Sequence, residues 1–250
     1  MKQLAFLIIT LCFVSLTNAQ ESKVFNLQNF DKVVIEYPAK IKIIYGQDYS
    51  IKIIDSSQTK TNILLFDSIL QQNNNNLKLA SISVLIKDST LFITNTADLP
   101  TRMFKVHIII TMPQIKYINV NTGALVEISG DFNLNNLFMD IQGACYIKLF
   151  DKPKIKHLKV IDEGASYIFI SLKNTIETAF FDISGASFIN SIETPIKHIN
   201  IIAQGASLAK IWAIESMTID ITGMSYIFYK GNPHKENINS DGLSIVKHVD

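Results

Sequence analysis

The chain has 250 residues, 48% of them apolar and 18% charged, and its 23 basic and 22 acidic side chains leave a formal net charge of +1. This composition excludes an intrinsically disordered chain and a collagen-like repeat. A nearly balanced charge gives no strong attraction to nucleic acid or to an anionic membrane surface, so we expect neither as a partner. Isoleucine dominates the apolar residues, and an excess of β-branched side chains favours strands over helices.

The N-terminus is typical of a secretory signal peptide. Lys2 supplies a positive charge, Leu4 to Leu16 forms a short apolar segment, and Ala19 is a small residue before the expected cleavage point. The apolar segment falls short of the roughly 20 residues that a membrane-spanning helix needs. We predict removal of residues 1–19, no transmembrane segment in the mature chain, and a final location in the periplasm, at the outer surface or outside the cell. A buried N-terminal strand is the alternative interpretation.

Residues 20–112 are expected to form a less regular β segment. Short β-branched runs are separated by turn residues, which predicts strands. The runs are Val33–Ile35, Ile41–Ile44, Ile51–Ile54, Leu91–Ile93 and Val106–Ile110. Residues 73–76 are predicted to form a polar loop, and residues 62–72 fit either a short helix or a strand.

Between residues 113 and 230 the sequence repeats with a period of about twenty residues. Each copy carries a turn glycine, followed in most copies by alanine and then serine. These turn glycines are Gly123, Gly143, Gly164, Gly185, Gly205 and Gly223. Such repeats are typical of solenoids, in which each unit buries its apolar face against its neighbours. Apolar and polar residues alternate around each glycine, which predicts strands. We expect an all-β, β-helix-like solenoid with a corner at each glycine, capped by residues 231–250 and continuous from about residue 24.

A second period of two coils lies inside the first. Alternate coils begin with a proline followed by isoleucine and lysine, at residues 113–117, 153–157 and 195–198. The intervening coils carry an aspartate three residues before the glycine, namely Asp140, Asp182 and Asp220. Either the unit of duplication is two coils, or these similarities are coincidences of turn chemistry.

Several of these features occur in an order that resembles a known family. Phe30-Asp31-Lys32-Val33 is followed by Leu91–Ile93, by the serial Gly-small-Ser turns and by the closing segment Tyr226–Pro233, with Asp241-Gly242 after it. This order, over about residues 28–248, resembles the secreted proteins called putative auto-transporter adhesin, head GIN domain, which are common in Bacteroidetes. The resemblance implies a right-handed β-helix-like fold and export, and it brings no catalytic residues.

The three aspartates are the candidates for an enzymatic site. In a regular stack they would form an outward column with members two strand spacings apart, roughly 9.6 Å. That distance lies at the outer edge of the separation of about 6.5–9.5 Å used by inverting glycosidases. We favour the simpler interpretation, in which Asp140, Asp182 and Asp220 keep a solvent-facing strand soluble, and we assign no catalytic residue.

No metal or cofactor site is predicted. His157 and His198 stand seven residues before Gly164 and Gly205, so they too lie two coils apart. Ligands of one zinc ion must lie much closer together, and both histidines are expected to be surface residues with ordinary hydrogen-bond partners. Removal of Cys12 with the signal peptide leaves Cys145, which replaces a turn serine and is expected to pack in the interior.

One column could bind a ligand. Three residues after successive glycines stand Tyr146, Tyr167, Phe188, Leu208 and Tyr226. Alternation from the isoleucines that follow them places the column outside, where it would form a flat strip for sugar rings or another protein. Corners break alternation, however, and packing in the core or at a corner is the interpretation we favour from sequence.

Together these features predict an exported, non-enzymatic binding or adhesion module whose partner is a carbohydrate or a surface protein. The candidate ligand-binding residues are Tyr146, Tyr167, Phe188, Tyr226, Asp140, Asp182 and Asp220. A carbohydrate-active enzyme that uses the aspartate column is one alternative. A structural protein that self-associates through an uncapped coil or the aromatic column is the other.

Overall fold

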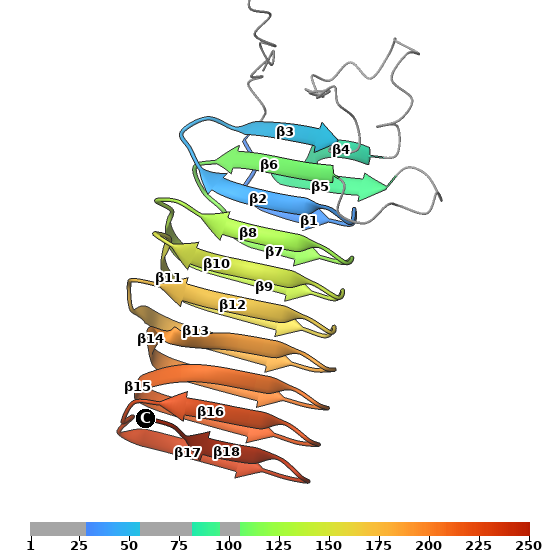
Figure 1. Ribbon diagram of the computed structural model, residues 1–250. Helices are drawn as coiled ribbons and strands as arrows, with labels where there is room; N and C mark the ends of the chain where they lie inside the picture. The colour runs from blue at the N-terminus through green and yellow to red at the C-terminus, as the bar shows by residue number, and fades with distance from the viewer. Residues whose placement is uncertain (1–28, 56–81, 96–105) are drawn as a thin grey trace, which may run out of the picture.

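A computed structural model describes residues 29–55, 82–95 and 106–250 (Figure 1). The regular elements within these ranges are all strands. No helix there has the length and apolar character needed to cross a membrane. The predicted signal peptide, the undecided segment 62–72 and the predicted loop 73–76 lie outside the described residues.

The strands are numbered in chain order. They are β1 (Lys32–Ile35), β2 (Lys40–Tyr45), β3 (Ser50–Asp55), β4 (Ile82–Lys87), β5 (Thr90–Asn95), β6 (Val106–Met112), β7 (Tyr117–Val120), β8 (Leu125–Ser129), β9 (Asn133–Ile141), β10 (Tyr146–Asp151), β11 (Lys154–Asp162), β12 (Tyr167–Leu172), β13 (Ile176–Ile183), β14 (Phe188–Ala203), β15 (Leu208–Ile221), β16 (Tyr226–Lys230), β17 (Lys235–Ser240) and β18 (Ile245–His248).

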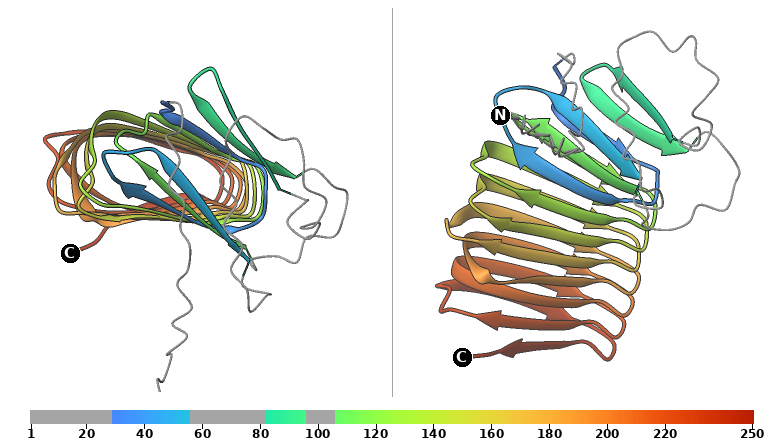
Figure 2. Two further views of the ribbon diagram at one scale, coloured as in Figure 1. Left: turned by 90° about the horizontal axis from the view of Figure 1, so that it is seen from above. Right: turned by 45° about the horizontal axis from the view of Figure 1, so that its top comes forward.

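The chain winds into a flattened tube with two parallel walls (Figure 2, left). The first sheet contains β1, β7, β9, β11, β13, the second halves of β14 and β15, and β17. The second sheet contains β2, β8, β10, β12, the first parts of β14 and β15, β16 and β18. Neighbouring strands pair in parallel, so that each coil stacks on the one before it. The predicted all-β solenoid is therefore confirmed.

The N-terminal end departs from chain order. The coil of β1 and β2 lies between the later coil of β5 and β6 on one side and that of β7 and β8 on the other. Two antiparallel strands cover the outer edge of β5 and β6, because β4 pairs with β5 and β3 pairs with β6. Antiparallel edge strands of this kind close the stack at that end (Figure 1).

Side chains of equal register form ladders through the interior. One ladder of the second sheet, fully buried throughout, consists of Val126, Ile147, Ile168, Ile189, Ala209 and Ile227. The residues between these positions point outward, as strand alternation requires. Because the register holds from coil to coil, every outward position also becomes a column along the tube.

The corner glycines permit the coils to stack closely. A Cβ atom placed on Gly164 would strike the carbonyl oxygen of Gly143, and one placed on Gly205 would lie 2.8 Å from the carbonyl oxygen of Gly185. That same Gly185 oxygen accepts a hydrogen bond from the backbone N–H of Ala206 at 2.9 Å. Gly205 also has a φ of +81°, a left-handed conformation that disfavours side chains. The repeat glycine is therefore required by the close approach of successive corners.

Buried hydroxyl groups reinforce these corners. The hydroxyl of Ser166 donates to the carbonyl of Gly143 at 2.9 Å, and that of Ser187 donates to the carbonyl of Gly164 at 3.1 Å. Cys145 occupies the equivalent position, where its thiol donates to the carbonyl of Thr122 at 2.9 Å. Burial raises the pKa of this thiol, so Cys145 is a packing residue, as predicted from its place in the repeat.

The substitution Gly205→Ala is expected to lower the free energy of unfolding by about 1–3 kcal/mol, because the added methyl group is forced into a left-handed backbone and against a stacked carbonyl. Urea denaturation measures the change. Gln204→Ala alters an exposed side chain at the same corner and serves as the control. Equal stability of the two variants would contradict the requirement for glycine at the stacked corners.

The last coil replaces three apolar ladder residues with polar ones, while Ile238 and Val246 continue the ladders of Ile219 and Ile227. Glu236 and Ser240 of β17 continue the ladders of Met217 and Ile221, and His248 of β18 continues that of Tyr229. The Tyr229 hydroxyl donates to a Glu236 carboxylate oxygen at 3.3 Å. These three residues, Glu236, Ser240 and His248, form a polar end layer. Charged or polar groups that point inward oppose pairing of an open edge with another molecule.

Apolar replacement of this layer should therefore cause association. In the double variant Glu236→Met/Ser240→Ile, we expect a sedimentation coefficient that rises with protein concentration, because two more apolar ladders then reach the open end beside those of Ile238 and Val246. The matched control is Lys235→Met/Asn239→Ile, which adds similar side chains to the outward side of the same strand. A double variant that stays monomeric, or a control that associates equally, would show that the end layer has no such role.

Candidate functional site

The aromatic column lies on the outer surface of the second sheet. The backbone register aligns Leu125, Tyr146, Tyr167, Phe188, Leu208 and Tyr226 in one row. Tyr146 and Tyr226 are each 39% exposed, and the members between them are partly exposed. The interpretation favoured from sequence, packing in the core or at a corner, is wrong. Alternation holds here because the column begins just after each corner, within regular strand.

Neighbouring rings in this column contact one another. Tyr146 and Tyr167 are stacked, with centroids 5.2 Å apart and planes only 8° from parallel. Tyr167 and Phe188 meet edge to face with centroids 4.9 Å apart. Both arrangements are favourable for aromatic pairs. The contacts hold the rings in a continuous apolar strip along the tube axis.

A second set of rings flanks the column, and lysines accompany it. Lys148 and Phe169 share the next outward row, and Lys148 places its Nζ atom 4.2 Å from the ring centroid of Phe150. Lys230 places its Nζ atom 4.2 Å from the ring centroid of Trp212. We call this surface the aromatic face. Its residues are Tyr146, Lys148, Phe150, Tyr167, Phe169, Phe188, Lys210, Trp212, Tyr226 and Phe228.

A pocket of about 650 Å³ lies at one edge of the aromatic face. Its lining consists of Lys148, Phe150, Asp151, Phe169, Ser171, Leu172, Lys173, Glu193, Pro195 and Trp212, and we call it the Trp212 pocket. This pocket was not predicted from the sequence. Continuing the alternation from Tyr146 and Tyr167 would have placed Phe150 and Phe169 outside, but nothing in the sequence brings Trp212 and Glu193 to them.

A largely apolar hollow of about 580 Å³ lies at the N-terminal end of the same face. Its lining includes apolar and aromatic residues from four different strands, namely Ile54, Ile109, Leu125 and Tyr146. Lys40 and Lys42 also line it. Lys42 pairs with Glu127 at 3.5 Å. The aromatic column thus continues at this end into an aliphatic surface.

The three aspartates lie on the outer surface of the first sheet and do not gather. The register places Ile161 between Asp140 and Asp182, and Ile202 between Asp182 and Asp220. Asp140 accepts a hydrogen bond of 3.0 Å from the Tyr117 hydroxyl, and burial together with this bond raises the pKa of Tyr117 to about 12. Asp220 accepts from Asn239 at 3.2 Å. The carboxylates are therefore separated by apolar residues.

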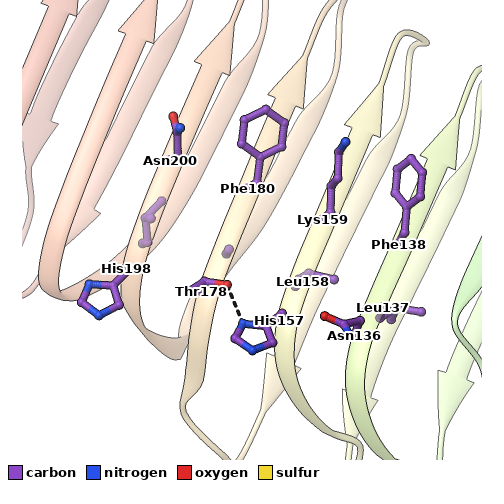
Figure 3. A pocket seen from close by; sticks show the side chains of 12 residues that line it. Asn136, Leu137, Phe138, His157, Leu158, Lys159, Thr178, Phe180, His198 and Asn200 are labelled. Atoms are coloured by element: carbon purple, nitrogen blue, oxygen red, sulfur yellow. Dashed lines mark hydrogen bonds between the residues drawn. The ribbon is translucent and has the colours of Figure 1, made fainter.

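The two histidines border a shallow groove of about 480 Å³ on the first sheet (Figure 3). In the strand register, Thr178 lies between the two histidines. The Thr178 hydroxyl forms a hydrogen bond of 2.8 Å with Nδ1 of His157, and the Ser216 hydroxyl forms one of 2.9 Å with Nδ1 of His198. A second row contains Phe138, Lys159, Phe180 and Asn200. Within the described ranges, no three His, Cys, Asp or Glu side chains are grouped so as to hold a metal ion.

Comparison with known proteins places the chain in a family. A family profile described as "Putative auto-transporter adhesin, head GIN domain" matches residues 69–233, well over half of the chain. The chain belongs to this family. The resemblance expected from the sequence is thereby confirmed, although no curated protein matches the chain.

Solved structures share the fold. A putative adhesin from Bacteroides fragilis superposes with a TM-score of 0.75 at 20% identity, covering 91% of this chain and 95% of the other. A putative adhesin from Parabacteroides merdae gives 0.68 at 15% identity with the same coverage. A putative lipid binding protein from Parabacteroides distasonis gives 0.65 at 12% identity, covering 92% and 96%. At these identities the likeness concerns the fold alone.

A buried carboxyl group in the corner region was also missed by the sequence analysis. Asp162 is fully buried and continues the interior ladder between Ile141 and Ile183. Its Oδ1 atom accepts from the backbone N–H of Gly164 at 3.1 Å, whereas Oδ2 has no hydrogen-bond partner. Burial is the main cause that raises the pKa of this carboxyl group. The alternation of Leu158, Val160 and Asp162 was the sequence signal for its inward position.

The raised pKa makes stability depend on pH. The folded protein holds the proton of Asp162 more tightly than the unfolded chain, so this stabilisation is present at acid pH and is lost as pH rises above the ordinary range of an aspartate. The variant Asp162→Asn cannot ionise, so its free energy of unfolding should rise relative to that of the native protein between pH 4 and pH 7. We expect a rise of about 1–3 kcal/mol, the usual cost of burying a polar group without a hydrogen-bond partner. Urea titrations at several pH values measure the difference. A difference that does not change with pH would contradict this prediction.

Proposed function

We propose that this protein is a non-enzymatic binding module, exported or held at the cell surface, and that it binds carbohydrate through the aromatic face. The observation that carries the proposal is the outward column of Tyr146, Tyr167 and Phe188, which Leu208 continues to Tyr226. Partly exposed aromatic side chains offer an apolar strip to the C–H groups of a sugar ring, and nearby lysines and hydroxyls can fix its orientation.

Three further considerations support this proposal. Family membership and the names of two structural neighbours point to adhesion, which is binding without chemistry. The N-terminal sequence predicts export, and glycans are the common polymers at the cell surface. Tyr146, Tyr167 and Phe188 are already in contact with one another, so little side-chain freedom remains to be lost when a ligand binds to them.

The spacing of the column matches an extended ligand rather than a small one. Successive coils lie about 4.8 Å apart, so the five positions from Tyr146 to Tyr226 present a strip several sugar units long. A strip of equivalent sites binds a polymer by many weak contacts, each of which raises the effective concentration of the next. We therefore expect affinity to rise with oligosaccharide length.

A glycan array probed with purified residues 20–250, followed by calorimetry on the best hit, tests the proposal. Tyr167→Ala and Phe188→Ala should each weaken binding about tenfold, equivalent to about 1.4 kcal/mol, because each removes a central ring. Phe180→Ala is the matched control, since Phe180 is a partly exposed ring on the opposite sheet. It should leave the affinity unchanged.

The outcomes separate the alternatives. Binding that survives both ring variants would place the ligand elsewhere and contradict the proposed face. Shortened or unsaturated products from a bound glycan, abolished by Asp182→Asn, would identify an enzyme instead. Vesicles that bind the protein while every glycan fails would favour a lipid ligand, the class named for one structural neighbour.

A further inference from the structure

The Trp212 pocket has the chemistry of a subsite for one particular sugar class. Three rings line it from separate coils, with Phe150 in β10, Phe169 in β12 and Trp212 in β15. Pro195 is the register partner of Trp212 and adds a fourth rigid ring. The volume of about 650 Å³ falls within the range of small-ligand sites. Trp212 is also the single tryptophan of the chain.

Lys148 and Lys173 line this pocket together with Asp151 and Glu193, and Lys230 lies next to it over the ring of Trp212. Lys148 lies over Phe150. Among the described residues, no carboxylate lies within 4.0 Å of the ammonium nitrogen of any of these lysines, in contrast to Lys42, Lys116, Lys152 and Lys197. An aromatic ring attracts an ammonium group but does not neutralise its charge. The three lysines therefore remain available to an anionic ligand.

Acceptors for hydroxyl groups stand beside the lysines. Ser171 donates to Oε2 of Glu193 at 2.7 Å, which fixes the carboxylate and leaves its second oxygen free to accept. Asp151, in a left-handed turn with a φ of +77°, also contributes to the lining. Carboxylates accept hydrogen bonds from sugar hydroxyls, whereas an ionised fatty acid has no hydrogen-bond donor to offer them. The pocket thus combines apolar platforms, unpaired cations and hydroxyl acceptors.

We propose that the Trp212 pocket binds a carboxylate-bearing sugar, such as a uronic acid unit of an acidic glycan. The sugar ring stacks against the aromatic lining, its carboxylate pairs with Lys230 or Lys148, and its hydroxyls donate to Glu193. This inference rests on the proposed glycan-binding function and names the sugar class at one subsite. The rest of the glycan would extend from the pocket along the aromatic column.

The single tryptophan allows a direct test. Trigalacturonic acid is titrated into the mature chain while tryptophan fluorescence is followed, and maltotriose serves as the neutral probe. We expect a saturable fluorescence change with the acidic trisaccharide that weakens as salt is raised, because the charges are partly exposed. Maltotriose should produce a change at least tenfold weaker in apparent affinity, since it has no carboxylate for the lysines.

Variants then locate the site. Lys230→Gln and Lys148→Gln should each weaken trigalacturonate binding about threefold to fivefold, the usual effect of losing one partly exposed ion pair. Lys159→Gln is the matched control, because Lys159 lies over Phe138 and Phe180 on the opposite sheet. Trp212→Phe, measured by calorimetry, should weaken binding while keeping the fold.

Each contrary result has a distinct meaning. Acidic binding that is insensitive to the lysine variants but lost in Tyr167→Ala overturns this subsite and leaves the proposed function intact. Neutral glycans bound as tightly as acidic ones also overturn it. The absence of binding to every glycan, acidic or neutral, overturns both the subsite and the proposed function.

Discussion

The close stacking of identical corners is the constraint on which the rest of the structure depends. Each corner approaches the one before it so closely that a Cβ on Gly205 would lie 2.8 Å from the carbonyl oxygen of Gly185. The same approach lets backbone N–H groups and the buried hydroxyls of Ser166 and Ser187 bond to stacked carbonyls. Since corners cannot shift past one another, the register next to each corner is fixed, and the shifts in the pairing of β14 with β15 lie away from the corners, between Asn190 and His198.

Fixed register turns single residues into columns, both inside and outside the tube. Inside, the ladder that includes Ile147 and Ile168 buries a continuous apolar core without a disulfide among the described residues. Outside, the same repetition generates the row of Tyr146, Tyr167 and Phe188. A solenoid thereby provides an extended surface strip without disturbing the core, because outward positions are free to vary once the interior ladder is complete.

Departures from the repeat occur at the C-terminal end, in the interior of the first sheet and at one edge of the second sheet. At the C-terminal end, Glu236 and His248 interrupt apolar ladders and leave a polar layer at the open edge. In the middle, Asp162 interrupts an isoleucine ladder and leaves one buried oxygen without a partner. At the edge of the second sheet, the pairing of β14 with β15 is irregular between residues Asn190 and Pro195, next to the Trp212 pocket. Irregular positions are thus the informative ones in an otherwise repetitive protein.

The sequence by itself determined the repeat, the corner glycines, the strand alternation and hence the all-β solenoid, because these follow from local spacing and from stacking at equal intervals. It also placed Asp140, Asp182 and Asp220 in one column with a coil between successive members. Tertiary structure decided which way the aromatic column faces, since a shift of one residue at a corner would reverse every side chain after it. It also placed the β1–β2 coil between later coils and brought Phe150, Phe169, Glu193 and Trp212 together. The proximity of residues from different coils depends on the angle through which each corner turns the chain. That angle cannot be predicted from the local sequence pattern.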